Sequence, residues 1–288
     1  MRLESQVSSP TVKRRRLSAA LRQLRVECGL TAAEAAKQLD WDPSKITRME
    51  RDEWKRPAPH DIRGLLDLYG VTDERRREAL LTLARESRQR GWWADYQDVF
   101  RSSLPDFEAG ASMIRSYEAL LIPGLLQTAE YTAAVLRGGQ VLGEAVIERR
   151  VQARLARQQI ISREDPPELV IVIDEAALHR MTGGAGVMRA QLEHVIDMAT
   201  RPNITVQVLP LSVGSHPAMT GGAFLILDFP SPDDPSLVYM ETATDDLWLE
   251  TPEELRRYTL IFSQVQGLAL SPDESVHHMA ALVDRLER

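Results

Sequence analysis

The sequence predicts a multidomain protein, in which an all-α domain of five helices is followed by an α+β (mixed α/β) domain. Two patterns predict this fold class. Up to about residue 90, apolar residues recur with the helical period, and each run is bounded by a capping residue or a glycine. From about residue 111, short runs rich in β-branched residues alternate with longer helical runs. The 288 residues are enough for two domains, since a domain takes about 100–200 residues.

The first two helices have recognisable end signals. Residues 17–28 place leucines at i, i+4 and i+7 and end at Gly29, a residue that readily closes a helix in the left-handed conformation. Thr31 precedes the second run as N-cap, and Glu34 follows three positions later, which together form a capping box. Residues 1–16 are polar and end in a basic run, and we expect them to form a flexible N-terminal arm.

Three more helices complete the first domain, which we place at residues 17–90. Asp42 and Pro43 are the N-cap and first position of the third helix, 43–51, where proline costs no hydrogen bond. The fourth helix follows a Pro-Ala-Pro segment and ends at Gly70. The fifth ends near residue 90.

The rest of the chain is expected to be a connector and a second domain. Residues 91–110 are aromatic and aperiodic, which indicates a connector, and residues 111–288 form the α+β domain. Its expected strands are 112–118, 169–173, 204–209, 224–229, 237–241 and 247–250. Its expected helices are 129–136, 144–161, 187–200, 252–268 and 272–286. These patterns do not predict the order of the strands.

The charge is unevenly distributed along the chain. Residues 1–70 hold 14 Lys and Arg against 10 Asp and Glu, whereas residues 71–288 hold 21 against 32. A basic head of net charge +4 therefore precedes an acidic body of net charge −11. This asymmetry is typical of a nucleic-acid-binding domain joined to a domain with another task.

Composition and motifs argue against several classes of protein. Cys28 is the one cysteine, so neither an intramolecular disulfide nor a thiolate metal cluster can form. The six histidines lack the spacing of zinc ligands, and we expect no metal. No glycine-rich phosphate or dinucleotide motif is present, and we expect no cofactor. The N-terminus lacks a signal peptide and no apolar run is long enough to span a membrane, so we expect a cytoplasmic protein without membrane contact.

The second and third helices have the spacing of a helix-turn-helix. Residues 40–42 form a turn short enough to hold the two helices at a steep angle. In the third helix Ile46 and Met49 face the core, which leaves a polar set outward: Ser44, Lys45, Thr47, Arg48 and Arg51. Such a helix suits the major groove of DNA, where arginine can bond guanine through two hydrogen bonds. The alternative is that these are two helices of an ordinary bundle with a solvated charged face.

Residues 17–70 resemble the Xre family of five-helix, phage-repressor-like DNA-binding domains. The resemblance rests on the Gly-Leu-Thr opening of the second helix, the Lys-Ile-Thr-Arg-Met-Glu of the third, and a basic loop after it. It implies base reading by Pro43, Ser44 and Arg48, and an ion pair between Arg25 and Glu50. Asp40 departs from the glycine preferred in the turn, although aspartate tolerates the left-handed region. The full expected DNA-binding set is Thr31, Pro43, Ser44, Lys45, Thr47, Arg48, Lys55 and Arg56.

A second resemblance spans nearly the whole chain. The strings RGWWADY, IRSYEALLIPGLLQTAEYTAAVL, MRAQLEHV and NITVQVLPL are similar to a large actinobacterial family that joins an Xre-type head to a C-terminal domain without assigned chemistry. Its members include antitoxin-like regulators and are often encoded beside a small partner protein. The resemblance implies a transcriptional regulator whose C-terminal domain binds such a partner. We expect a homodimer on a pseudo-palindromic operator in double-stranded DNA, because one head reads only about half a site.

Two sets of residues are candidates for a partner or ligand surface. Arg150, Arg154 and Arg157 fall on one helix face, either as a solvated face paired to acids or as a docking stripe for an acidic partner or anion. Trp92 and Trp93 are either a seam between domains or an exposed groove.

Two other functions remain as alternatives. The C-terminal domain could instead sense a small molecule and modulate DNA affinity. A protein of another class, an enzyme or a scaffold that binds no DNA, is disfavoured by the motifs. The one place for a hydrolase is Ser215 and His216, but these are neighbours in sequence, no acid partner is indicated, and the Gly-x-Ser-x-Gly motif is absent.

Overall fold

The chain folds into two units, which we describe separately. The N-terminal unit comprises residues 1–95 and 105–110, and the C-terminal unit comprises residues 96–104 and 111–288. The computed structural model describes residues 9–54, 56–100, 102–139, 141–232, 234–242 and 244–286. The expected fold class is confirmed, since the first unit is helical and the second carries a sheet with helices.

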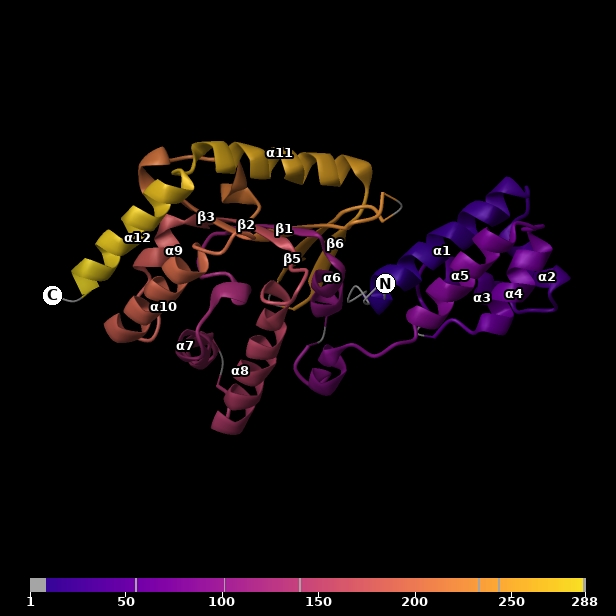
Figure 1. The fold of residues 1–288 in the computed structure, drawn as a ribbon, viewed down its shortest axis with the longest axis horizontal. Helices are drawn as coiled ribbons and strands as arrows, with labels where there is room; N and C mark the ends of the chain where they lie inside the picture. Colours follow the sequence, from indigo (N-terminus) through magenta and orange to yellow (C-terminus); the bar gives the residue numbers. More distant parts are fainter. Residues whose placement is uncertain are drawn as a thin grey trace. The chain divides into compact units, whose positions relative to one another are not determined.

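Five helices form the core of the N-terminal unit: α1 (Pro10–Glu27), α2 (Ala32–Gln38), α3 (Pro43–Glu50), α4 (Pro59–Leu68) and α5 (Glu74–Glu86) (Figure 1). Their apolar faces meet in one cluster that includes Leu17, Leu21, Ile46, Ile62 and Leu66, each at most 1% exposed. Burying such side chains stabilises the unit by about 1.5–3 kcal/mol each, which fixes the angles between the helices.

The first helix begins earlier than expected. Residues 10–16 were expected to belong to a flexible arm, but α1 starts at Pro10, and Ser9 caps it by accepting a hydrogen bond from Val12 N. The Ser9 hydroxyl also donates to Asp106 Oδ1 (2.6 Å), and Asp106 Oδ2 accepts from Thr11 N (3.2 Å). A carboxylate at the N-terminus of a helix stabilises it. The remainder of the expected arm, 1–8, lies outside the described residues.

The expected connector, 91–110, contains two helical elements. A 3₁₀ helix, η1, spans Trp92–Tyr96, and α6 spans Leu104–Gly110. Residues 105–110 belong to the N-terminal unit, where Gly110 lies against Ser9 so closely that a Cβ on it would come within 2.6 Å of the serine Cβ. The sequence shows no periodicity here because α6 has only two turns.

The C-terminal unit is built on a six-stranded mixed sheet. Its strands are β1 (Met113–Glu118), β2 (Glu168–Asp174), β3 (Ile204–Leu209), β4 (Phe224–Asp228), β5 (Leu237–Glu241) and β6 (Asp246–Leu249), in the order β3-β2-β1-β4-β5-β6. The first three pair in parallel, with Ile114 opposite Leu169, and the last three extend the sheet antiparallel. Long crossovers that carry helices connect the parallel strands, as parallel pairing requires.

Helices cover both faces of this sheet (Figure 1). Helix α11 (Pro252–Leu268) lies along one face, where Phe262 and Val265 pack with Tyr117 and Phe224 of the strands. The other face carries α7 (Ala129–Gly139), α8 (Glu144–Gln158), the short α9 (Glu175–His179) and α10 (Ala185–Met198). Helix α12 (Pro272–Leu286) packs on α10 and β3.

Candidate nucleic-acid interface

Helices α2 and α3 form a helix-turn-helix. The α2 side chains Ala35 and Ala36 are fully buried, so the two helix backbones can approach closely. Asp40 has a φ of +55°, which is the left-handed conformation expected in the turn, and Trp41 N donates to Ala36 O at 2.8 Å. Each helix has its own N-cap, since Thr31 and Glu34 form a capping box and Asp42 accepts from Ser44 N. Local sequence signals therefore fix this geometry.

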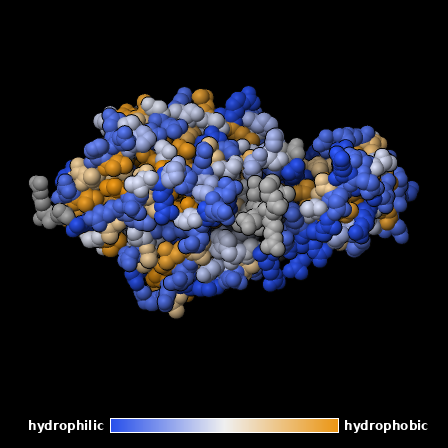
Figure 2. Space-filling view, in the orientation of Figure 1, coloured by the Kyte–Doolittle hydropathy of each residue, from blue (hydrophilic) through white to orange (hydrophobic). Residues whose placement is uncertain are grey.

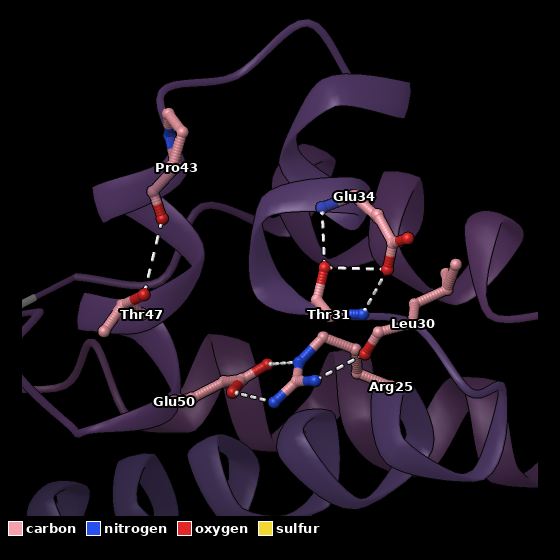
Figure 3. Close-up of polar contacts among 7 residues, drawn as sticks. All are labelled: Arg25, Leu30, Thr31, Glu34, Pro43, Thr47 and Glu50. Carbon is pink, nitrogen blue, oxygen red and sulfur yellow. Dashed lines mark hydrogen bonds and ion pairs between the residues drawn. The ribbon is translucent and has the colours of Figure 1, made fainter.

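Helix α3 has one buried face and one exposed face. Ile46 is 1% exposed and Met49 2% exposed, which fixes the helix against the core. Pro43, Ser44 and Arg48 are exposed, as base reading requires. The half-buried Thr47 has its hydroxyl 3.4 Å from Pro43 O, within the helix (Figure 3). Thus Arg48 is the long cationic side chain that α3 presents to solvent along this face.

Lys45 is engaged inside its own unit. Its Nζ donates to Asp61 Oδ1 of α4 at 2.8 Å and lies 3.7 Å from the centroid of the Trp41 ring. The ion pair and the cation–π contact both stabilise this position of the ammonium group, and they compete with any contact to a DNA base. Lys45, a member of the expected DNA-binding set, thus links α3 to α4 and keeps 33% of its side chain exposed.

Arg25 of α1 and Glu50 of α3 form an ion pair through two hydrogen bonds (Figure 3). Arg25 Nε and one terminal nitrogen donate to the two carboxylate oxygens at 2.6 and 2.8 Å, and the other nitrogen donates to Leu30 O. The two side chains are only 13% and 8% exposed. The hydrogen bond to Glu50 raises the pKa of the Arg25 guanidinium further above its usual value. This pair ties the recognition helix to α1.

Carboxylates occupy the N-termini of α2 and α3. The hydrogen bonds from Thr31 lower the pKa of Glu34, and those from Ser44 lower the pKa of Asp42, so both remain ionised. The positive end of the α3 dipole attracts anions, but Asp42 already occupies this end, where it accepts a hydrogen bond from Ser44 N. Contacts to DNA are therefore expected from side chains rather than from the backbone N–H groups at the start of α3.

Exposed cations surround α3, although the sequence pattern singled out only some of them. Of the basic loop, Arg56 is exposed, and Lys55 lies outside the described residues. Two further exposed cations were missed, namely Lys37 on α2 and Arg63 on α4. Arg63 could have been found, because the apolar period of α4 turns it away from the core. The basic run before Leu17 is different: Lys13 pairs with Glu86, and Arg14 pairs with Asp52 through two hydrogen bonds.

Two of the three arginines of the expected stripe, Arg154 and Arg157, contact other parts of the C-terminal unit. Arg154 donates to Gln127 Oε1 at 2.7 Å, and both Arg154 and Arg157 lie beside the backbone of Gly124. Their charges also act on Glu118, lowering the pKa that burial raises. Arg150 is half-buried. These contacts favour the structural interpretation of the stripe over the docking interpretation.

The tryptophan pair is half-buried within the N-terminal unit. The rings of Trp92 and Trp93 meet edge to face, with centroids 5.9 Å apart. The Trp93 ring lies over Gly91, where any Cβ would come within 1.9 Å of the ring. A side chain at position 91 would therefore displace the Trp93 ring.

His216 has an acid partner that the sequence did not indicate. Its Nε2 lies 3.5 Å from Asp174 Oδ2, an atom that also accepts from the Tyr117 hydroxyl. The buried Nδ1 of His216 has no hydrogen-bond partner among the described residues. The sequence neighbours Ser215 and His216 thus do not form a nucleophile and base pair.

Among the residues that the structure describes, no group of three or more His, Cys, Asp or Glu could hold a metal ion.

Comparison with protein-family models assigns both units. Residues 16–79 match a model described as a helix-turn-helix domain, and residues 101–281 match one described as a domain of unknown function, DUF5753. The second match covers more than half of the chain. The chain belongs to the DUF5753 family. No curated protein matches this DUF5753 chain, and no solved structure matches it. Because residues 16–79 match the helix-turn-helix model, the N-terminal unit is a helix-turn-helix DNA-binding domain.

No helix in the described residues is both long and apolar enough to cross a membrane.

Proposed function

We propose that this DUF5753 protein is a sequence-specific transcriptional regulator of the Xre type that catalyses no reaction. It binds a pseudo-palindromic operator as a homodimer, and its C-terminal unit binds a small protein partner in the manner of antitoxin-like regulators. The observation that carries the DNA-binding part is α3, whose inner face is buried and whose outer face exposes Ser44 and Arg48. Selection of bound fragments from the source genome, followed by footprinting, tests it: a single recurring inverted repeat is expected, and uniform recovery of all fragments would contradict it.

Arg48→Ala is expected to weaken operator binding by about 1–3 kcal/mol and to affect random DNA much less, because a hydrogen-bonded base contact is lost. Affinity for both DNAs measured at one salt concentration checks this. Lys37→Ala, which removes an exposed cation from α2, is the matched control and should weaken both DNAs alike. An equal loss on operator and random DNA for Arg48→Ala would assign it to phosphate.

Arg56→Ala is expected to act on operator and random DNA equally, because this exposed arginine lies in the loop after α3. Each phosphate contact releases counterions, so the slope of log affinity against log salt should fall by about one. Titrations at four salt concentrations measure it. An unchanged slope would show that Arg56 touches no phosphate.

Self-association is assigned to the C-terminal unit in this proposal. The fragment to compare with the full chain is 1–110, because residues 105–110 complete the N-terminal unit and Asp106 caps α1. The full chain is expected to have the mass of a dimer in solution, and the fragment that of a monomer with weaker operator affinity. A fragment that dimerises and binds as tightly as the full chain would move the dimer contact to the head.

A small-molecule sensor is the second candidate function for the C-terminal unit. Its candidate ligand site is a groove beside α7 and α8, whose volume of about 580 Å³ is within the range of ligand pockets. A shift in melting temperature with a metabolite library, in the absence of any protein partner, would support the sensor over the partner-binding regulator.

A further inference from the structure

A groove in the C-terminal unit lies between α7, α8 and the start of α10. Its volume is about 580 Å³, and it is open along its length rather than enclosed. The apolar lining residues are Ala129, Ala133, Ala134, Ile147, Val151, Gly183 and Val187. Figure 2 shows hydrophobic side chains gathered over α7 and the N-terminal half of α8. Val146, on the first turn of α8, is 45% exposed and adds to the apolar surface at this end.

The floor of the groove is small and closely packed. Gly183 has a φ of +76°, and a Cβ on it would come within 2.9 Å of both the Ala134 and the Val187 side chains. Three alanines of α7 line the same floor. Small side chains let the backbone of an added helix approach closely, since interaxial distance depends on the side chains at the contact. The floor is therefore shaped for a helix rather than for a bulky side-chain cluster.

The rim of the groove carries unbalanced negative charge. Glu130, Glu144 and Glu148 stand around it against one cation, Arg137. Arg137 is already used, because it donates two hydrogen bonds to Glu144. Glu130 and Glu148 are exposed and carry no ion pair among the described residues. An occupant that pairs them must supply two cations at the edge of an apolar stripe.

We propose that this groove binds one amphipathic helix of a protein partner, with a small apolar face flanked by Lys or Arg. This inference rests on the proposed partner-binding function and names its surface. The groove is lined by residues 129–137 of α7 and 144–151 of α8, which span about 12–14 Å, so two to three turns of a partner helix can lie in it. A small molecule would be poorly enclosed in such an open groove, whereas helix-in-groove recognition uses this shape.

The test uses the full chain and a phage-displayed library of 16-residue helical peptides. Their apolar stripe is fixed as Ala and Leu at i, i+3, i+4 and i+7, and the other positions are randomised. Selection is expected to enrich Lys and Arg beside the stripe. Glu130→Lys with Glu148→Lys should weaken the best peptide at least about tenfold, because two attractive charges become repulsive. Ala133→Trp, which fills the floor, should abolish binding.

The matched control is Glu164→Lys with Asp284→Lys, which makes the same charge change at exposed sites outside the groove. It should leave peptide affinity unchanged, and all variants should remain folded at the temperature of the binding assay, as judged by circular dichroism. The proposal is overturned if selection enriches acidic peptides or none, or if the two double variants lose affinity equally. A melting shift with small organic cations and no peptide enrichment overturns it in favour of sensing.

Operator and partner binding, measured on the same preparations, separate this inference from the proposed function. If wild type and groove variants bind a protein partner equally, the groove proposal fails and the partner-binding regulator stands. If the chain selects basic amphipathic peptides in the groove but binds no DNA, the groove proposal stands and the regulator fails.

Discussion

Glu50→Gln is expected to lower the free energy of unfolding of the N-terminal unit by about 3 kcal/mol. The change removes the negative charge opposite the largely buried Arg25 guanidinium and replaces one of the two carboxylate acceptors with an amide N–H donor, while Leu30 O stays an acceptor (Figure 3). Removing one partner of a buried pair costs about 3–5 kcal/mol, and the lower end applies because Arg25 keeps 13% of its side-chain surface in contact with solvent.

Chemical denaturation of the wild type, each single variant and Arg25→Gln/Glu50→Gln measures the coupling energy directly. Glu53→Gln is the matched control, since Glu53 is exposed three residues further on and should change stability by less than about 0.5 kcal/mol. Operator affinity should fall with the single variants as well, because the pair orients α3. A coupling energy of zero would show that the two residues contribute independently.

The helix-turn-helix could be predicted closely because its signals are local. The capping box of Thr31 and Glu34, and the cap of Asp42 with Pro43, lie within four residues of the helix ends they define. Asp40 adopts the left-handed conformation that its short polar side chain permits. Each of these features depends on neighbouring residues alone.

The start of α1 could not be predicted, because its stabilising contacts come from far along the chain. Asp106 is 97 residues from Ser9, and Glu86 is 73 residues from Lys13. The local sequence does not show whether the basic run at residues 13–16 is free in solution or paired with carboxylates that lie far along the chain. The same limit applies to Lys45, whose position on α3 suggested DNA but whose carboxylate partner, Asp61, is 16 residues further along the chain on α4.

In the C-terminal unit the strands were found but their order was not. All six begin and end within one residue of expectation, because alternating and continuous apolar runs are local patterns. The order β3-β2-β1-β4-β5-β6 arises from pairings between segments tens of residues apart, such as Ile114 with Leu169. Likewise the period of α8 placed Arg154 and Arg157 on one face, whereas only the fold shows that this face meets Gly124.

Glu118 at the end of β1 is expected to make the C-terminal unit less stable as the pH rises. Burial raises the pKa of this carboxyl from about 4.5 to about 7, although the Ser116 hydroxyl, Arg157 and Arg154 act in the opposite direction. The folded state therefore holds the proton more tightly than the unfolded state. Where the unfolded state binds fewer protons, stability falls with rising pH. The Glu118 contribution is full below about pH 4.5 and is lost as the pH passes about 7.

Glu118→Gln removes this titration while keeping the size of the side chain. At pH 8 the variant is expected to exceed the wild type in free energy of unfolding by about 2–3 kcal/mol relative to their difference at pH 4.5, since one pKa unit corresponds to about 1.4 kcal/mol. Urea unfolding at several pH values measures the difference, which cancels other titrating groups. Glu168→Gln, which removes an exposed carboxyl at the start of β2, is the matched control. If Glu118→Gln gives a constant difference, the pKa of Glu118 is the same in the folded and unfolded states, and the Ser116 hydroxyl, Arg157 and Arg154 offset the effect of burial.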